Sequence, residues 1–384
     1  MKLFTVLTIV AVCLIAWARS KKPFIRKVSD WVEGEYIVVF KDEIVGDVAT
    51  ATEAIMKKLD PLDLKLAKVN RVFNKAINGA VIQTMNVKSI DLLESMASEL
   101  GIAYIEQDAK VKPAEIWNLD RIDQTSNILD GTFNPSGDGT GVNVYLVDTG
   151  IYTDYSNFAN EPTDWIDIYS GRKAPVKGDC NGHGTHMAGT IGSMTYGVAK
   201  NVNLLSVRIF DCNGDTTWGY VIDALEYILA NSNPNIPSVI NLSLSGGVSD
   251  AANAAVNKLY DAGILPIVAA GNGGINSCET SPASAEKALV VGGLGQADEQ
   301  VFNYGQCVDV IAPAINIESL NFERTRKIPS VIASGTSSAA AHVTGAAAII
   351  LQNNPNWTPV DVENFIKSTA TTVTGLDNPI LYVY

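Results

Sequence analysis

The chain has 384 residues, 47% of them hydrophobic and 18% charged, which leaves room for more than one domain at ~100–200 residues each. A disordered protein is excluded, because disorder combines low hydrophobicity with high charge. The net charge is −13, and from Pro113 onward 12 Lys+Arg stand against 27 Asp+Glu. We therefore expect no binding to nucleic acid or to an anionic membrane, whose phosphates need a basic patch.

The first 18 residues have the pattern of a secretory signal peptide. Lys2 precedes an apolar run from Leu3 to Ile15, and Ala16-Trp17-Ala18 places small residues at a cleavage site. The alternative is a membrane anchor, but a spanning helix needs ~20 apolar residues and this run is shorter. We expect residues 1–18 to be removed and the mature protein to be secreted, without a membrane span.

Residues 19–112 are predicted to form a small α+β unit on one antiparallel sheet. Period-two and β-branched patterns indicate strands, and apolar residues at helical spacing indicate helices between them. In chain order the elements are a strand at Tyr36–Phe40, a helix at Asp47–Leu59, a strand at Gly79–Met85, a helix at Ser89–Leu100 and a strand at Ala103–Ile105.

Residues 113–384 are predicted to form a larger α/β unit. Short buried-type strands are expected at Val142–Val147, Val202–Val207, Val239–Leu242 and Leu265–Ala269, and helices at Thr185–Ile191, Tyr220–Ala230, Asp250–Ala262 and Ser337–Leu351. Strands that alternate with helices need crossover connections, so the sheet should be mostly parallel, with helices on both faces.

The first segment with chemistry is Val147-Asp148-Thr149-Gly150, an acid at the end of a buried strand. Sites in open α/β sheets form at the carboxyl ends of strands. An aspartate there can orient an imidazole and stabilise its charged form. A turn or helix-cap role is the alternative, so this segment alone does not identify Asp148 as a catalytic residue.

The second segment, Asn181 to Gly189, holds two of the three histidines, His183 and His186. Flanking glycines would let the backbone pass close to a substrate. A zinc-protease motif spaces its histidines by four with a glutamate between, and neither condition is met. We therefore predict His183 as a general base and His186 as a structural neighbour.

The third segment, Ser334 to His342, opens a helix of small residues with Ser337 at its start. Free N–H groups and the helix dipole favour negative charge there. A hydroxyl so placed can be deprotonated by an imidazole and attack a carbonyl. The alternative is an ordinary helix-capping serine.

The chain order Asp148, His183, Ser337 is that of subtilisin, whereas α/β-hydrolases run Ser, Asp, His. No Gly-x-Ser-x-Gly elbow is present, which disfavours a lipid esterase. With these segments the sequence resembles the subtilisin superfamily, in particular its proteinase K-like branch. Further matching segments are Tyr196–Ala199, Val239–Leu244, Ala269–Asn272, Ser281–Ser284 and Asn303–Gly305.

The resemblance implies an auto-processed serine endopeptidase that acts through an acyl-enzyme and needs no catalytic cofactor. Asn272 would donate to the oxyanion together with the Ser337 N–H. The substrate-binding edge and pocket would comprise Ser243, Leu244, Ser245, Gly246, Ala269, Ala270 and Gly271. Small, apolar walls favour aliphatic or aromatic side chains before the scissile bond.

The resemblance also divides the chain into a signal peptide (1–18), an inhibitory propeptide of ferredoxin-like fold (19–112) and a catalytic domain (113–384). The junction should fall between Gln107 and Glu115. The propeptide would act as an intramolecular inhibitor, protein or peptide substrates would be the other partners, and the mature enzyme would be a monomer.

Four cysteines remain after Cys13 leaves with the signal, and an oxidising compartment favours disulfides. Three pairings are possible from the sequence, and zinc is disfavoured because no C-x-x-C spacing occurs. The resemblance implies the pairs Cys180–Cys212 and Cys278–Cys307. It also implies structural calcium, with one site at Asp120, Asp123, Gln124, Asp130 and Thr132 and another at Asp309 with the Glu286 and Ala288 carbonyls.

The chain departs from the family after the nucleophile, where Met-Ala-Thr-Pro-His is usual and Ser338-Ala339-Ala340-Ala341-His342 stands here. A displaced nucleophile can lose ~10²-fold in rate for about 1 Å. Tyr155 also replaces a common histidine. The alternative function is therefore a weak or inactive subtilisin-like protein that binds peptides without turning them over.

Overall fold

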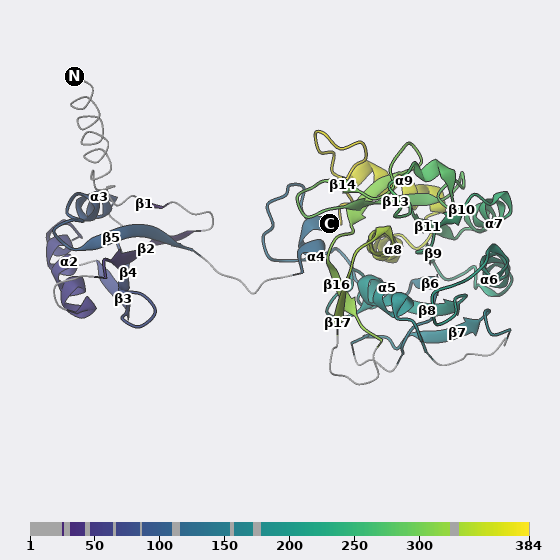
Figure 1. Ribbon diagram of the computed structural model, residues 1–384, viewed down its shortest axis with the longest axis horizontal. Coiled ribbons are helices and arrows are strands. Elements are labelled where there is room, and N and C mark those ends of the chain that lie inside the picture. The colour runs from purple at the N-terminus through teal and green to yellow at the C-terminus, as the bar shows by residue number, and fades with distance from the viewer. Residues whose placement is uncertain are drawn as a thin grey trace, which may run out of the picture. The chain divides into compact units, whose positions relative to one another are not determined.

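The structure is a computed structural model that describes residues 25–26, 31–42, 47–63, 67–84, 87–109, 116–153, 157–171, 178–322 and 330–383. The predicted signal peptide, most of the predicted junction and Tyr155 lie outside these residues. The chain divides into two compact units, Met1–Lys112 and Pro113–Tyr384, and Figure 1 shows the elements of each. Within the described ranges, no helix is long and apolar enough to cross a bilayer.

The first unit is a five-stranded sheet with two helices. Its elements are β1 (Ile25–Arg26), β2 (Trp31–Phe40), α2 (Val48–Asp63), β3 (Lys68–Phe73), β4 (Gly79–Gln83), α3 (Val87–Ser95) and β5 (Ile102–Ala109). The strand order is β1-β5-β2-β4-β3, and only β1 and β5 pair in parallel. From β2 to β5 the order is that of a ferredoxin-like βαββαβ unit.

The expected three-strand pattern was wrong in its strand count. It missed the two-residue strand β1 and also β3, an edge strand whose side chains are mostly exposed, among them Lys68, Asn70 and Arg71. An edge strand of this kind carries little hydrophobic alternation, and charged residues there prevent pairing with other chains. The core of the unit forms where α2 places Ile55 and Leu59 against the sheet, both fully buried.

The second unit is an α/β fold around an eight-stranded sheet (Figure 1). Its helices are α4 (Trp117–Ile122), α5 (His183–Gly192), α6 (Trp218–Asn231), α7 (Asp250–Asp261), η1 (Ser277–Glu279), α8 (Thr336–Asn353) and α9 (Pro359–Thr369). Its strands are β6 (Asn143–Asp148), β7 (Thr163–Asp167), β8 (Asn203–Arg208), β9 (Ser238–Leu242), β10 (Gly246–Gly247), β11 (Leu265–Ala269), β12 (Thr280–Ser281), β13 (Leu289–Leu294), β14 (Gln300–Val301), β15 (Val310–Pro313), β16 (Ile317–Leu320) and β17 (Ser330–Ala333).

The main sheet is parallel apart from β14, with the order β14-β13-β11-β9-β6-β8-β7 and β15 beside β13. Both of its faces are buried, as parallel sheets require. Along β6, Val144 and Leu146 point into the core that holds α5 and α8, whereas Tyr145 and Val147 point into the core that holds α6 and α7. The expected mostly parallel α/β fold is confirmed.

Helices α5 and α8 pack closely because their facing residues are small. A Cβ on Gly345 of α8 would lie 2.6 Å from Cβ of Val198 and 3.2 Å from the Ile191 carbonyl oxygen. This close approach brings the first turns of α5 and α8, which begin at His183 and Thr336, to the same end of the sheet.

Two disulfides, Cys180–Cys212 and Cys278–Cys307, form with the pairing that the resemblance implied. They close loops of 32 and 29 residues, for which the loop-entropy estimate is ~3–4 kcal/mol each. One lies just before the loop into α5 and the other anchors η1, so each holds a loop near the candidate site.

Candidate active site

Asp148 and His183 form a direct pair. Asp148 ends β6 and is 1% exposed, and His183 Nδ1 lies 2.8 Å from its Oδ1 and 3.0 Å from its Oδ2. The Nδ1–H must donate to the carboxylate, which leaves Nε2 as an acceptor. A side chain on Gly184 would collide with the Gly150 carbonyl, so glycine there allows α5 to approach β6.

Asp179 holds the loop that carries His183, a role that the sequence patterns did not predict. Its Oδ1 accepts the Asn181 and Gly182 N–H groups at 2.9 Å, and its Oδ2 accepts the Thr185 N–H and hydroxyl. It is 6% exposed. A short loop needs such acceptors to satisfy the first N–H groups of the helix, and a lone Asp before the glycines was the only signal available.

The groups around His183 change the pKa of its imidazole. Burial on its own would lower this pKa. The charge of Asp148 and its hydrogen bond oppose that effect, with a further contribution from Asp179, and the pKa is raised above its ordinary value. The imidazolium is therefore stabilised in place.

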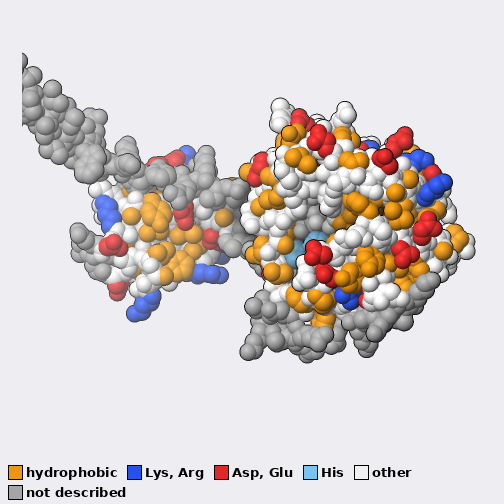
Figure 2. Space-filling model, turned by 45° about the vertical axis from the view of Figure 1, so that its right-hand side comes forward, with side chains coloured by type: hydrophobic (Ala, Val, Ile, Leu, Met, Phe, Trp, Pro, Cys, Tyr) orange, Lys and Arg blue, Asp and Glu red, His pale blue; other side chains and the backbone are white. Residues whose placement is uncertain are grey.

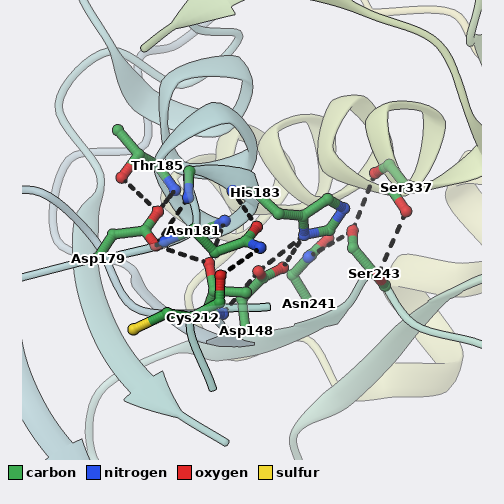
Figure 3. Close-up of polar contacts among 12 residues, drawn as sticks. Asp148, Asp179, Asn181, His183, Thr185, Cys212, Asn241, Ser243 and Ser337 are labelled. Atoms are coloured by element: carbon green, nitrogen blue, oxygen red, sulfur yellow. Dashed lines mark hydrogen bonds and ion pairs between the residues drawn. The ribbon is translucent and has the colours of Figure 1, made fainter. Parts of the chain in front are cut away.

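Ser337 is the second residue of α8, where the helix leaves its N–H unpaired within the helix. Its hydroxyl donates to the Ser243 carbonyl at 3.2 Å, and the Ser243 hydroxyl donates to the Ser337 carbonyl at 2.9 Å. Figure 3 shows the imidazole of His183 between Asp148 and Ser337. Within the described residues, the structure has no hydrogen bond from the Ser337 hydroxyl to His183 Nε2, and catalytic hydrogen bonds of this kind often tighten only when substrate binds.

Asn272 has its amide fixed by the start of α8. Its Oδ1 accepts the Thr336 N–H at 2.8 Å and the Thr336 hydroxyl at 3.0 Å. The Nδ2 group is thereby left as the donating end of the amide. Asn272 and Ser337 both line one cleft, so a donor from each can meet at one oxygen atom.

The cleft has a volume of about 1000 Å³. Figure 2 shows histidine atoms at a hollow in the surface, and His183 is the most exposed of the three histidines. Of the predicted substrate-binding residues, the ones that line the cleft are Ser243, Leu244, Ser245, Gly246, Ala269 and Gly271. Ala270 is fully buried and points into the core, because neighbouring residues of an extended segment face opposite sides.

His186 lies in the core. It is 3% exposed, and its Nε2 donates to the Ile317 carbonyl at 3.1 Å. Across the described ranges, no group of three or more His, Cys, Asp or Glu side chains is arranged to hold a metal ion.

The first predicted calcium site is a group of acids from α4 and the loop that follows it. Asp120 accepts the backbone N–H groups of Asp130 and Gly131, and Thr132 donates its hydroxyl to Asp130. Burial raises the pKa of Asp123, and the like charges of Asp120 and Asp130 add to the rise. The donor chemistry suits Ca²⁺, but the carboxylates are engaged by the loop, so calcium there stays a prediction.

The second predicted calcium site does not fit the ion. Asp309 Oδ1 lies 2.7 Å from Lys367 Nζ, and its Oδ2 accepts the Val290 N–H at 2.8 Å. The same ammonium reaches Glu363 at 2.6 Å. Lys367 thus supplies the positive charge that calcium would have brought.

The unusual segment after the nucleophile forms regular helix. Ser338 and Ala341 are buried, and α8 continues unbroken from Thr336 to Asn353. His342 Nδ1–H donates to the Ser338 carbonyl at 2.7 Å, and Asn118 Nδ2 donates to His342 Nε2 at 2.7 Å. The histidine is therefore neutral, and burial lowers its pKa to about 4.

Known proteins resemble this chain over most of its length. A family model described as the subtilase family matches residues 139–381. An extracellular serine proteinase of Thermus sp. (strain Rt41A) is 38% identical over 88% of this chain and 85% of its own. Alkaline serine exoprotease A of Vibrio alginolyticus is 36% identical over 91% of this chain and 67% of its own. A cold-adapted subtilisin-like serine proteinase of known crystal structure is 37% identical in sequence to this chain. Its structure superposes with a TM-score of 0.67, and the match covers 71% of this chain and 99% of the proteinase chain.

Proposed function

Because the chain belongs to the subtilase family and is a serine proteinase, which hydrolyses peptide bonds, we propose that Asp148, His183 and Ser337 are its catalytic triad. The observation that carries the proposal is the 2.8 Å contact between His183 and Asp148 on the cleft that Ser337 also lines. The protein is a secreted endopeptidase that works through an acyl-enzyme intermediate.

In the first half-reaction, Ser337 Oγ attacks the scissile carbonyl carbon while its proton moves to His183 Nε2. Asp148 holds the Nδ1–H and stabilises the imidazolium, in keeping with the raised pKa of His183. The imidazolium then gives the proton to the leaving amine, the C–N bond breaks, and an ester to Ser337 remains.

In the second half-reaction, water attacks the ester and gives a proton to His183 Nε2. The imidazolium returns that proton to Ser337 Oγ as the carboxylic acid leaves. Both tetrahedral intermediates place negative charge on the former carbonyl oxygen. Asn272 Nδ2 and the Ser337 N–H donate to that oxygen, and no cofactor enters any step.

Substrate binds as an extended strand along Ser243 to Gly246, where main-chain hydrogen bonds supply affinity for any sequence. The pocket for the side chain before the scissile bond lies between this edge and the wall from Ala269 to Gly271. Small and apolar walls favour aliphatic and aromatic side chains, which gives broad specificity.

The enzyme is made as a zymogen of the proteinase K-like branch. Residues 1–18 direct secretion, residues 19–112 inhibit the active site within the same chain, and residues 113–384 are the catalytic domain. The extracellular naming of the Thermus relative supports secretion, and the ferredoxin-like order of β2 to β5 suits a folded propeptide. The mature enzyme is a monomer, with a structural calcium ion held by Asp120 of α4 and Asp123 at the end of that helix.

The test is hydrolysis of an internally quenched peptide by the parent, by Ser337→Ala and by Ser334→Ala. Ser337→Ala should lose turnover by several orders of magnitude. Ser334→Ala removes the same hydroxyl three residues earlier and should retain activity. If Ser337→Ala and the parent turn over alike, the triad is wrong. If the parent binds the peptide and never cleaves it, the chain is a peptide-binding protein instead.

A further inference from the structure

A single carboxylate faces the cleft. Among the cleft-lining residues that the structure describes, Glu279 is the only acid, and no Lys or Arg is present. Its side chain is exposed, and the described parts of the chain give the carboxylate neither a hydrogen bond nor an ion pair. A negative charge is therefore available to whatever enters the cleft.

The backbone around Glu279 is held firmly. Glu279 ends η1 and follows Cys278, which is bonded to Cys307. Thr280 comes next, pairs with Gly247 across β10 and β12, and donates its hydroxyl to the Ser277 carbonyl at 3.0 Å. The backbone of Glu279 is thus fixed at the Gly247 end of the substrate-binding edge, and its carboxylate extends from there.

The opposite end of that edge touches the nucleophile, since Ser243 exchanges hydrogen bonds with Ser337. Extended chain advances ~3.3 Å per residue, so Gly247 lies at most ~13 Å from Ser243 along the edge. A lysine side chain reaches about 6 Å from Cα to Nζ with bonds of ~1.5 Å, and a glutamate carboxylate reaches about 4 Å from its own Cα. With a hydrogen bond of about 2.9 Å between them, the two side chains together span about 13 Å, so a lysine or arginine side chain entering from the nucleophile can meet Glu279.

The walls between the two ends suit the stem of such a side chain. A Cβ on Gly271 would lie 2.9 Å from Ser245 Oγ, so a side chain at this position would fill space beside Ser245 that the glycine leaves open. The wall residues Gly246 and Ala269 are small, and they offer no charge of their own. Lysine and arginine bury their aliphatic stems against such surfaces while their charged ends reach a polar group.

We propose that Glu279 is a specificity-determining residue that selects substrates with lysine or arginine immediately before the scissile bond. It adds these cationic residues to the apolar side chains that the walls accept. This inference rests on the proposed function, because it assigns a substrate class to the same cleft.

The test compares internally quenched peptides that differ only at that position, with Lys, Leu or Glu, in parent and variants. The measured quantity is the ratio of kcat/KM for the Lys peptide to that for the Leu peptide. A ratio within one preparation does not depend on the folded fraction. Glu279→Gln should lower it about tenfold, the scale of one charge-assisted contact at a partly exposed site.

Glu279→Lys should lower the ratio further and raise cleavage of the Glu peptide. Added salt should shrink the parent's preference, because it screens charges that remain near solvent. Glu161→Gln is the matched control: it removes the same charge from an exposed residue that does not line the cleft. Its ratio should equal that of the parent.

The two proposals fail separately. An unchanged ratio in Glu279→Gln, with all peptides still cleaved, overturns the role of Glu279 and leaves the proteinase intact. The same fall in Glu161→Gln also overturns it, because the effect would then come from net charge. If no peptide is cleaved by the parent, the proposed function fails first.

Discussion

Substituting His342 should make the protein less sensitive to acid. Burial lowers the pKa of His342 to about 4 from 6.5. Between pH 6.5 and pH 4 the His342 imidazole is protonated in the unfolded chain but stays neutral in the folded protein. The contribution of His342 to the free energy of unfolding is therefore complete above pH 6.5 and declines as the pH falls toward 4. A pKa lowered from 6.5 to about 4 corresponds to roughly 3 kcal/mol in full, of which about 2 kcal/mol is lost between pH 7 and pH 4.5.

The assay is urea unfolding of the full chain carrying Ser337→Ala, which prevents self-digestion, with and without His342→Gln. Tryptophan fluorescence follows it, since four of the six tryptophans lie after Pro113, and the unfolding and refolding curves must coincide. From pH 7 to pH 4.5 the variant should lose about 2 kcal/mol less than its parent. Subtracting the loss of the variant from that of its parent cancels the contributions of the other titrating groups, including those of His183 and His186. Parallel losses would refute the reasoning.

Three further outcomes concern the active site and calcium. Asn272→Ala should lower kcat by ~10²–10³ with little change in KM, because the donor acts only on the developing oxyanion; an equal rise in KM would point to ground-state binding instead. Asp148→Asn should lower kcat by up to ~10⁴. It should also move the acid limb of kcat/KM to lower pH, since Asp148 raises the pKa of His183; an unmoved limb would contradict this. Chelation by EDTA should lower the Tm of the parent but not that of Asp123→Asn, as a bound ion stabilises only the folded state; identical shifts would exclude calcium at that loop.

Local patterns in the sequence were sufficient to predict the larger fold. Buried strands such as β6, β9 and β11 are short apolar runs, and their positions were predicted to within a residue or two. The edge strand β3 was missed because its side chains face solvent, so its residues carry no hydrophobic periodicity. Pairing across a sheet is a tertiary property and leaves little trace in such a segment.

At the site, the sequence predicted residues that sit in glycine-bounded segments. It missed Asp179, Lys367 and Glu279, whose roles depend on what the fold brings beside them. Lys367 lies 58 positions after Asp309 in the sequence, and only the packing of α9 makes it the partner of that carboxylate. Ala270 was wrongly assigned to the cleft wall, because sequence position alone does not say which face a side chain takes.

The most direct test of the central claim is the mass of the secreted protein, measured for the parent beside Ser337→Ala. If Ser337 is the nucleophile of a self-processing proteinase, only the parent loses the residues before about Pro113, and Ser337→Ala keeps them. If both proteins are trimmed alike, or neither is, self-processing by Ser337 is contradicted.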